Sequence, residues 1–314
     1  MVGSTDKRHH VPAACIGYFS ETPKAIRRKS MVAVHRFVPD VNFMARAENV
    51  GFSRDIYRGS PFPEGGWDND NYFATFEKMA HKEVDRIGSS PSGAIPADDW
   101  IRVAAYVTSQ FARAPDLELS LDVLAEEMGM SRENMDVGYL MNLPRVGSAV
   151  LRARWEFVRS PSIDFILNDR AIAGIRYGDW DSFGYFVPLR KRFGIRLAGG
   201  PFSKRITRVN GEWKIEIPIV DLEDFQVEQL NRWTWCGGVA EVYGPSIEHL
   251  DHVRAQVSAG SMWDDVREIA RRIEGASMLT LSNSQRVADE WLLPSLMGGI
   301  KEPEQGIENV HLSV

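Results

Sequence analysis

The hydrophobic pattern of the chain changes its period near the middle of the sequence. Between residues 72 and 153, apolar side chains recur every three or four positions, which places them on one face of a helix. The clearest helix runs from Asp98 to Arg113: an aspartate can cap its start, and the residue before Pro115 disfavours helix. From Trp155 onward apolar and polar residues alternate, which is typical of β-strands.

A turn at residues 160–162 separates two of these alternating stretches, 155–157 and 163–167. Their apolar residues share one parity, so a hairpin would bring them to the same buried face. The five side chains expected to be buried together are Trp155, Phe157, Ile163, Phe165 and Leu167.

Asp169 continues the same parity, so its carboxylate is expected to point toward the apolar side. A buried carboxylate is costly unless it is hydrogen-bonded, paired with a cation or bound to a metal. The alternative is a strand-end aspartate that caps the next turn.

The dipeptide Asn210–Gly211 is the strongest turn signal in the chain, because both residues readily adopt the positive φ angles of a type I′ turn. It predicts a hairpin of strands 204–209 and 212–220. Further strands are expected at 185–189 and 194–198.

Four regions follow from these patterns. Residues 1–71 are expected to be irregular with one short strand, 72–153 to be helical, 154–297 to mix strands and helices, and 298–314 to form a tail. Asp221 is expected to cap a helix that reaches about Trp235. Helices first and hairpins later indicate an α+β fold: a helical N-terminal half packed on a C-terminal antiparallel or mixed β-sheet with flanking helices. No glycine-rich strand-to-helix turn is present, so no nucleotide cofactor motif is expected.

Composition excludes only a few classes of protein. The chain has 314 residues, enough for a full core, and its net charge of −6 gives no general attraction to polyanions. Cys15 and Cys236 are too few for a disulfide framework and fit reduced thiols. No window approaches the roughly 20 apolar residues of a membrane span. A cytoplasmic protein with no membrane partner is therefore expected.

The segment 182–211 concentrates basic residues without a single acidic one. Aromatic residues lie among them, a mixture that can hold phosphates and stack bases. The segment predicts contact with nucleic acid or a nucleotide. The alternative is a basic outer face balanced by the acids at 212–228. The basic residues are Arg190, Lys191, Arg192, Arg196, Lys204, Arg205 and Arg208.

Two further groups contain possible metal ligands or acid–base residues. Glu77 and His81 are four residues apart, on one helix face, whereas Glu83 lies further round the helix. In an extended chain His9 and His10 point to opposite sides, so only one could face a given site. The alternatives are a solvated helix face and a hydrogen-bonded or exposed histidine pair.

The order of these motifs resembles that of a bacterial family, domain of unknown function 4238. HHVPAACIGYF is similar to its motif of histidine, any residue, aliphatic residue and proline, followed by a later phenylalanine. FEKMAHKEVDRI is similar to its paired-glutamate helix, and SQFARAP to its arginine–any–proline helix end. Trp155 and Asp169 match a tryptophan and a strand ending in serine–aspartate–asparagine–proline, although the residues flanking Asp169 differ. Pro188–Leu189 and Leu230–Asn231 match later points, and the resemblance covers roughly residues 7–250.

The resemblance implies that the matching polar positions could gather in one site. The first hypothesis is a metal-assisted hydrolase acting on nucleic acid or a nucleotide, in which Mg²⁺ or Mn²⁺ orients a water molecule. Arg113 would steady a phosphate, and the basic segment would guide the phosphate backbone. The expected metal ligands are Glu77, Glu83 and Asp169, and the expected catalytic residues are His9, Asp169, Arg113 and Asn231.

The second hypothesis is a non-catalytic binding or sensor protein. Here the same polar set forms a buried structural network, and the basic segment docks a partner or polyanion. A transferase that uses a nucleotide-like donor is a third possibility.

Overall fold

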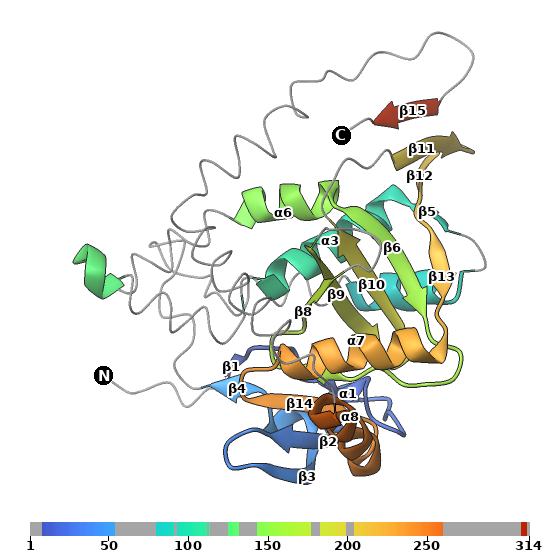
Figure 1. Cartoon of the computed structure of the whole chain (residues 1–314). Helices are drawn as coiled ribbons and strands as arrows, with labels where there is room; N and C mark the ends of the chain where they lie inside the picture. Colours follow the sequence, from blue (N-terminus) through green and yellow to red (C-terminus); the bar gives the residue numbers. More distant parts are fainter. Residues whose placement is uncertain are drawn as a thin grey trace.

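The structure, a computed structural model, has the α+β fold expected from the sequence (Figure 1). In the described part of the chain, no helix is long and apolar enough to span a membrane. The described residues are 8–53, 80–90, 93–111, 113, 125–131, 143–176, 183–198, 204–259 and 309–312.

A five-stranded mixed sheet forms the centre of the fold. Its strand order is β13-β6-β10-β9-β8, in which β13 runs parallel to β6 and all other neighbours are antiparallel. The strands expected at 185–189 and 194–198 are confirmed as β9 and β10, which pair with each other. The strands are β6 (Arg154–Arg159), β8 (Ala173–Arg176), β9 (Phe183–Arg190), β10 (Phe193–Ala198) and β13 (Ile219–Asp221).

A second, four-stranded antiparallel sheet joins the N-terminal segment to later strands, in the order β3-β2-β14-β7. Its strands are β2 (Met31–Arg36), β3 (Val41–Arg46), β7 (Leu167–Asn168) and β14 (Glu241–Gly244). β1 (Arg8–His9) and β4 (Phe52–Ser53) pair with each other in a separate two-stranded antiparallel sheet. The short strand expected in the N-terminal region is β2, but residues 8–53 contribute four strands, so the expectation of an otherwise irregular region was wrong. β2 pairs with β14, about two hundred positions later, which local patterns do not reveal.

The third sheet contains the predicted hairpin, with order β15-β11-β12-β5. Asn210 and Gly211 have φ angles of 52° and 82°, as a type I′ turn requires. The strand after the turn is shorter than expected, because residues 219–221 pair with β6 instead. The expected tail contributes β15. The strands are β5 (Ala94–Pro96), β11 (Lys204–Val209), β12 (Glu212–Glu216) and β15 (Asn309–Leu312).

Helices cover the sheets on several sides. α3 packs against α6, and α7 contacts α8, β7 of the second sheet and β8 of the central sheet, so it lies between these two sheets (Figure 1). Glu223, not Asp221, caps α7: its backbone N–H donates to Gln226 Oε1 at 3.0 Å in a capping box. Residues 80–88 and 125–128 are also helical. The labelled helices are α1 (Ala13–Gly17), α3 (Ala97–Phe111), α6 (Leu143–Arg152), α7 (Asp224–Cys236) and α8 (Ile247–Ala259), with 3-10 turns η1 (Arg27–Lys29) and η2 (Ala47–Asn49).

The aromatic core predicted around the 160–162 turn is present, but not as a hairpin. Trp155, Phe157, Phe165 and Leu167 are buried, and Ile163 is half-buried against the same core. β6 pairs with β10 and β13, whereas β7 pairs with β14 in the second sheet. The chain therefore crosses from one sheet to the other between the two stretches, which keeps the shared burial without the expected pairing.

Candidate ligand-binding site

Asp169 lies at the end of β7, where its buried carboxylate meets backbone amides. Oδ1 accepts from Val239 N–H at 2.9 Å, and Oδ2 accepts from Ala240 N–H at 2.7 Å and Glu241 N–H at 3.2 Å. Burial raises the pKa of Asp169, and the three N–H donors oppose that rise. The inward orientation predicted from parity holds, and the carboxylate fixes the chain that enters β14.

Glu241, which the sequence analysis did not single out, forms a second buried network. Its Oε1 accepts from Arg36 Nε at 2.9 Å, and its Oε2 accepts from Gly51 N at 3.1 Å and Tyr243 Oη at 3.0 Å. Gly51 has a φ of 65°, and a Cβ there would lie 2.7 Å from Tyr243 Oη. Only glycine fits this turn, because both the space and the backbone conformation exclude a side chain. A charged residue inside the apolar strand EVYG was the signal available in the sequence.

Arg113 contacts the backbone of His9. The contact is a hydrogen bond from Arg113 Nη2 to the backbone carbonyl of His9, so the imidazole itself does not make it. His10 hydrogen-bonds to the backbone of Arg113, and burial nevertheless lowers the pKa of His10 to about 4. His10 is therefore uncharged near neutral pH, next to a guanidinium.

Glu83 belongs to a different group, between residues 80–88 and α3. Its Oε1 lies 2.9 Å from Arg102 Nη1 and 3.8 Å from Arg86 Nη2. Arg86 Nη2 also reaches Asp99 Oδ1 at 2.6 Å. Burial raises the pKa of Asp99, and Arg86 partly offsets this. These two arginines balance the two acids.

Asn231 is also bound to the backbone. Its Oδ1 accepts from Ile166 N–H at 3.0 Å, and its Nδ2 donates to Asp164 O at 2.9 Å. The side chain thus holds the segment that leads into β7.

The predicted site residues therefore divide among several local networks, and Glu77 lies outside the described residues. Among the residues that the structure describes, no three His, Cys, Asp or Glu side chains gather closely enough to hold a metal ion.

The first part of the basic segment is engaged by the protein itself. Arg190 Nε donates to Asp85 Oδ1 at 2.8 Å, its Nη2 donates to His81 O at 3.0 Å, and its guanidinium carbon lies 3.5 Å from the centre of the Tyr18 ring. Its Nη1 donates to Leu189 O at 2.7 Å. The side chain thus ties β9 to residues 80–88 and to the turn after α1.

Arg192 is also hydrogen-bonded within the protein through every nitrogen of its guanidinium group. Its Nε donates to Asp164 Oδ1 at 2.8 Å, and its Nη1 and Nη2 donate to Pro161 O at 2.7 Å and Ser162 O at 3.0 Å. All three nitrogens thus hold the loop between β6 and β7.

The remaining basic residues differ in their surroundings. Lys191 Nζ donates to Glu21 O at 3.1 Å, and Arg196 Nε donates to Glu156 Oε2 at 2.6 Å. The exposed Arg208 lies 5.6 Å from the ring centre of Trp213. The side chains of Lys204 and Arg205 lie outside the described residues. The described part of the basic segment is thus largely an ion-paired surface. The acidic partners of Arg190, Arg192 and Arg196 are Asp85, Asp164 and Glu156, which lie outside the acids at 212–228 that the alternative named.

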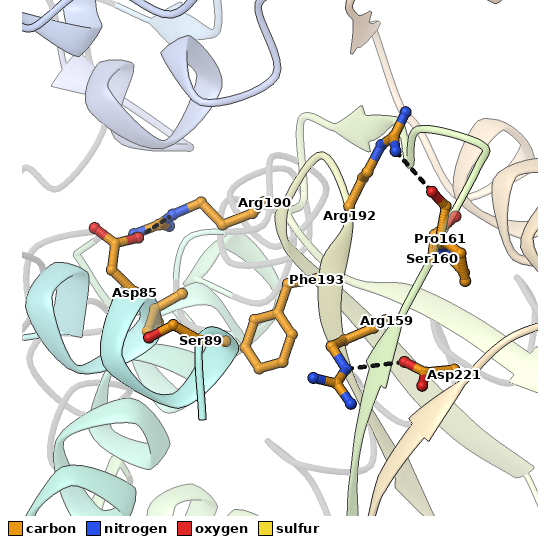
Figure 2. Close-up of a pocket in the computed structure, with 11 residues that line it drawn as sticks. Asp85, Ser89, Arg159, Ser160, Pro161, Arg190, Arg192, Phe193 and Asp221 are labelled. Atoms are coloured by element: carbon orange, nitrogen blue, oxygen red, sulfur yellow. Dashed lines mark hydrogen bonds and ion pairs between the residues drawn. The ribbon is translucent and has the colours of Figure 1, made fainter. Parts of the chain in front are cut away.

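Part of this surface borders an open pocket with a volume of about 640 Å³ (Figure 2). One wall is the end of the helix at 80–88, with Asp85, Gly88 and Ser89. The other is formed by Arg159 of β6, the turn before β10, and Asp221 of β13. The pocket therefore lies where the helical part of the chain meets the central sheet.

Two residues give the pocket its chemistry. Phe193 is almost fully buried and stacks on Phe157, with ring centres 5.5 Å apart and planes at 17°. Arg159 Nε donates to Asp221 Oδ1 at 2.9 Å, and its guanidinium lies between the Phe193 ring and Asp221 in Figure 2. The pocket thus combines an aromatic wall with a half-exposed cation. Arg159 and Phe193 lie just outside the predicted strands, and the β6–β10 register brings them opposite each other.

Comparisons with known proteins add no relative. No family model matches the chain, and no curated protein or solved structure matches it either. Membership of the domain of unknown function 4238 family stays a prediction based on the ordered motifs.

Proposed function

We propose that this protein binds a small anionic ligand, without covalent chemistry, in the pocket beside Arg159 and Phe193. The observation that carries the proposal is the unused bonding capacity of Arg159. Its Nε is bound to Asp221, and neither Nη nitrogen has a partner among the described residues. A guanidinium presents its N–H donors in a fork that suits a carboxylate or phosphate.

The size of the pocket supports this function. Sites for small molecules commonly have volumes of about 300–1,000 Å³ and combine apolar walls with a few polar groups. The 640 Å³ pocket has an aromatic residue and an arginine with free donors. Arg190 and Arg192 form its rim, but their nitrogens already hold the chain, so the anion selects Arg159.

The buried polar residues fit a structural role in such a binding protein. Asp169 and Asn231 bond to backbone groups, and networks whose members satisfy one another can fix a fold without chemistry. Metal-assisted hydrolysis of nucleic acid or a nucleotide, with Mg²⁺ or Mn²⁺, stays a prediction. It relies on Glu77, which lies outside the described residues, and on Glu83, whose Oε1 already contacts arginines.

The test is an NMR titration of the full chain with sodium butanoate and with inorganic phosphate. We expect one of these anions to shift the amide signals of Ser89, Ser160 and Phe193, and Arg159→Gln to weaken its binding by about tenfold or more, since hydrogen bonds to charged groups contribute about 1.5–3 kcal/mol. Arg254→Gln is the matched control, because Arg254 of α8 is also a half-exposed arginine paired with a single aspartate, Asp40. Equal affinity in Arg159→Gln and the parent, or no shifts at the pocket with either anion, would contradict the proposal.

A further inference from the structure

The pocket offers acceptors as well as donors, and these lie on its opposite walls. Asp85, on the helical wall, uses only Oδ1 to bind Arg190. Asp221, on the sheet wall, uses only Oδ1 to bind Arg159. Both side chains are exposed, and the Oδ2 atom of each has no partner among the described residues. A ligand in the pocket therefore meets free carboxylate oxygens as well as the free nitrogens of Arg159.

The helical wall has a second source of negative potential. The helix at 80–88 ends at the pocket, where Gly88 and Ser89 form part of the lining. The carbonyl groups at a helix C-terminus carry partial negative charge, which favours a cation nearby. Asp85 and this helix end therefore act in the same direction.

Arg190 of β9 pairs with Asp85 but leaves the second oxygen of that carboxylate without a donor among the described residues. Its Nε binds Asp85 Oδ1, and its Nη1 and Nη2 donate to backbone carbonyls. An anion bound to Arg159 alone would leave Asp85 Oδ2 and the helix end without a cation or a donor. A ligand with a cationic group at its other end would supply one.

We infer that the ligand is a small zwitterion, which rests on the proposed function of the pocket. Its carboxylate binds the Nη nitrogens of Arg159, its ammonium group binds Asp85 Oδ2 beside the helix end, and the carbon chain between them crosses Phe193. Asp85 receives the ammonium group, because it lies beside the helix end on the wall opposite Arg159, whereas Asp221 binds the same guanidinium that holds the carboxylate.

Matched probes separate the two charges. The full-length protein is titrated with β-alanine, 4-aminobutanoate and 6-aminohexanoate, each beside the carboxylate of equal length, and with butylamine. We expect at least one zwitterion to bind ten times more tightly than its carboxylate partner, and butylamine to bind more weakly than that zwitterion. Carboxylates that bind as tightly as all three zwitterions would overturn this inference and leave the anion-binding function standing. Binding of phosphate but of none of these compounds would also overturn the zwitterion inference and leave the anion-binding function standing. No binding of any probe would contradict both proposals.

Variants then assign the ammonium site. Asp85→Asn should remove the preference for the zwitterion over its carboxylate partner, whereas Arg159→Gln should weaken the binding of both. Asp40→Asn is the matched control, because Asp40 is also an exposed aspartate paired with a single arginine. A preference that survives in Asp85→Asn would overturn the assignment. The comparison of probes on the parent protein stands even if a variant loses its fold.

Discussion

Asp169 is buried beside three backbone N–H groups, and its environment shows how single residues divide between structure and binding. A carboxylate has about four lone-pair directions, and three of these are used to hold residues 239–241. Arg159 shows the opposite state, since one of its three nitrogens holds Asp221 and two stay free among the described residues. The second kind of residue is the one available to a ligand.

His10 gives a prediction at this scale. Its pKa in the fold is about 4, against about 6.5 when unfolded. Between these pH values the unfolded state binds more protons than the folded state. The stability that neutral His10 contributes is therefore complete above about pH 6.5 and is lost as the pH falls toward 4. For a shift of this size the loss is on the order of 3 kcal/mol.

His10→Gln should therefore flatten the fall in unfolding free energy between pH 7 and pH 4.5, measured by urea titration. The exposed His252→Gln is its control. His81, whose pKa is also lowered to about 4 by burial, supplies the part of the fall that remains. An unchanged slope in His10→Gln would show that the imidazole is not buried in its neutral form.

At the scale of elements, two arginines at the turn between β9 and β10 hold the neighbouring segments in place. Arg190 extends from it to residues 80–88, and Arg192 extends to residues 161–164. Both side chains shape the rim of the pocket. The basic residues predicted to guide nucleic acid therefore position the chain around the pocket.

Arg192→Glu tests this role. The substitution places a carboxylate next to Asp164 and the carbonyls of Pro161 and Ser162, so we expect it to lower the unfolding free energy by about 1–2 kcal/mol. Arg254→Glu, which loses a single exposed pair, should cost less. Unchanged stability together with loss of salt-sensitive nucleic-acid binding would instead favour the polyanion hypothesis.

Local signals in the sequence predicted the elements that depend on neighbouring residues. The spacing of apolar residues placed α3, and Asn210–Gly211 placed the β11–β12 hairpin. α8 was missed although Leu250, Val253 and Val257 have helical spacing. The parity of Asp169 predicted its inward side chain but not its partners, which lie seventy positions later.

At the scale of the whole molecule, contacts between distant segments decide both the fold and the site. Arg36 and Glu241 are 205 positions apart, and Arg190 and Asp85 are 105 apart. Patterns along the chain contain no information about such pairs, so the pairing of β2 with β14 and the pocket could not be predicted. The polar residues singled out in the sequence lie mostly in the networks that join these segments.

We propose that Arg159 binds the ligand and that Asp169 supports the fold, and two variants measured side by side test this division. Unfolding free energy and butanoate or phosphate affinity are measured on Arg159→Gln and Asp169→Asn. We expect Arg159→Gln to lose about tenfold or more in affinity at nearly unchanged stability. Asp169→Asn should lose about 1–3 kcal/mol of stability, because one backbone N–H or more is left facing an amide NH₂, and should bind like the parent. The reverse pattern, with binding lost in Asp169→Asn and retained in Arg159→Gln, would show that the buried acids, and not Arg159, form the binding site.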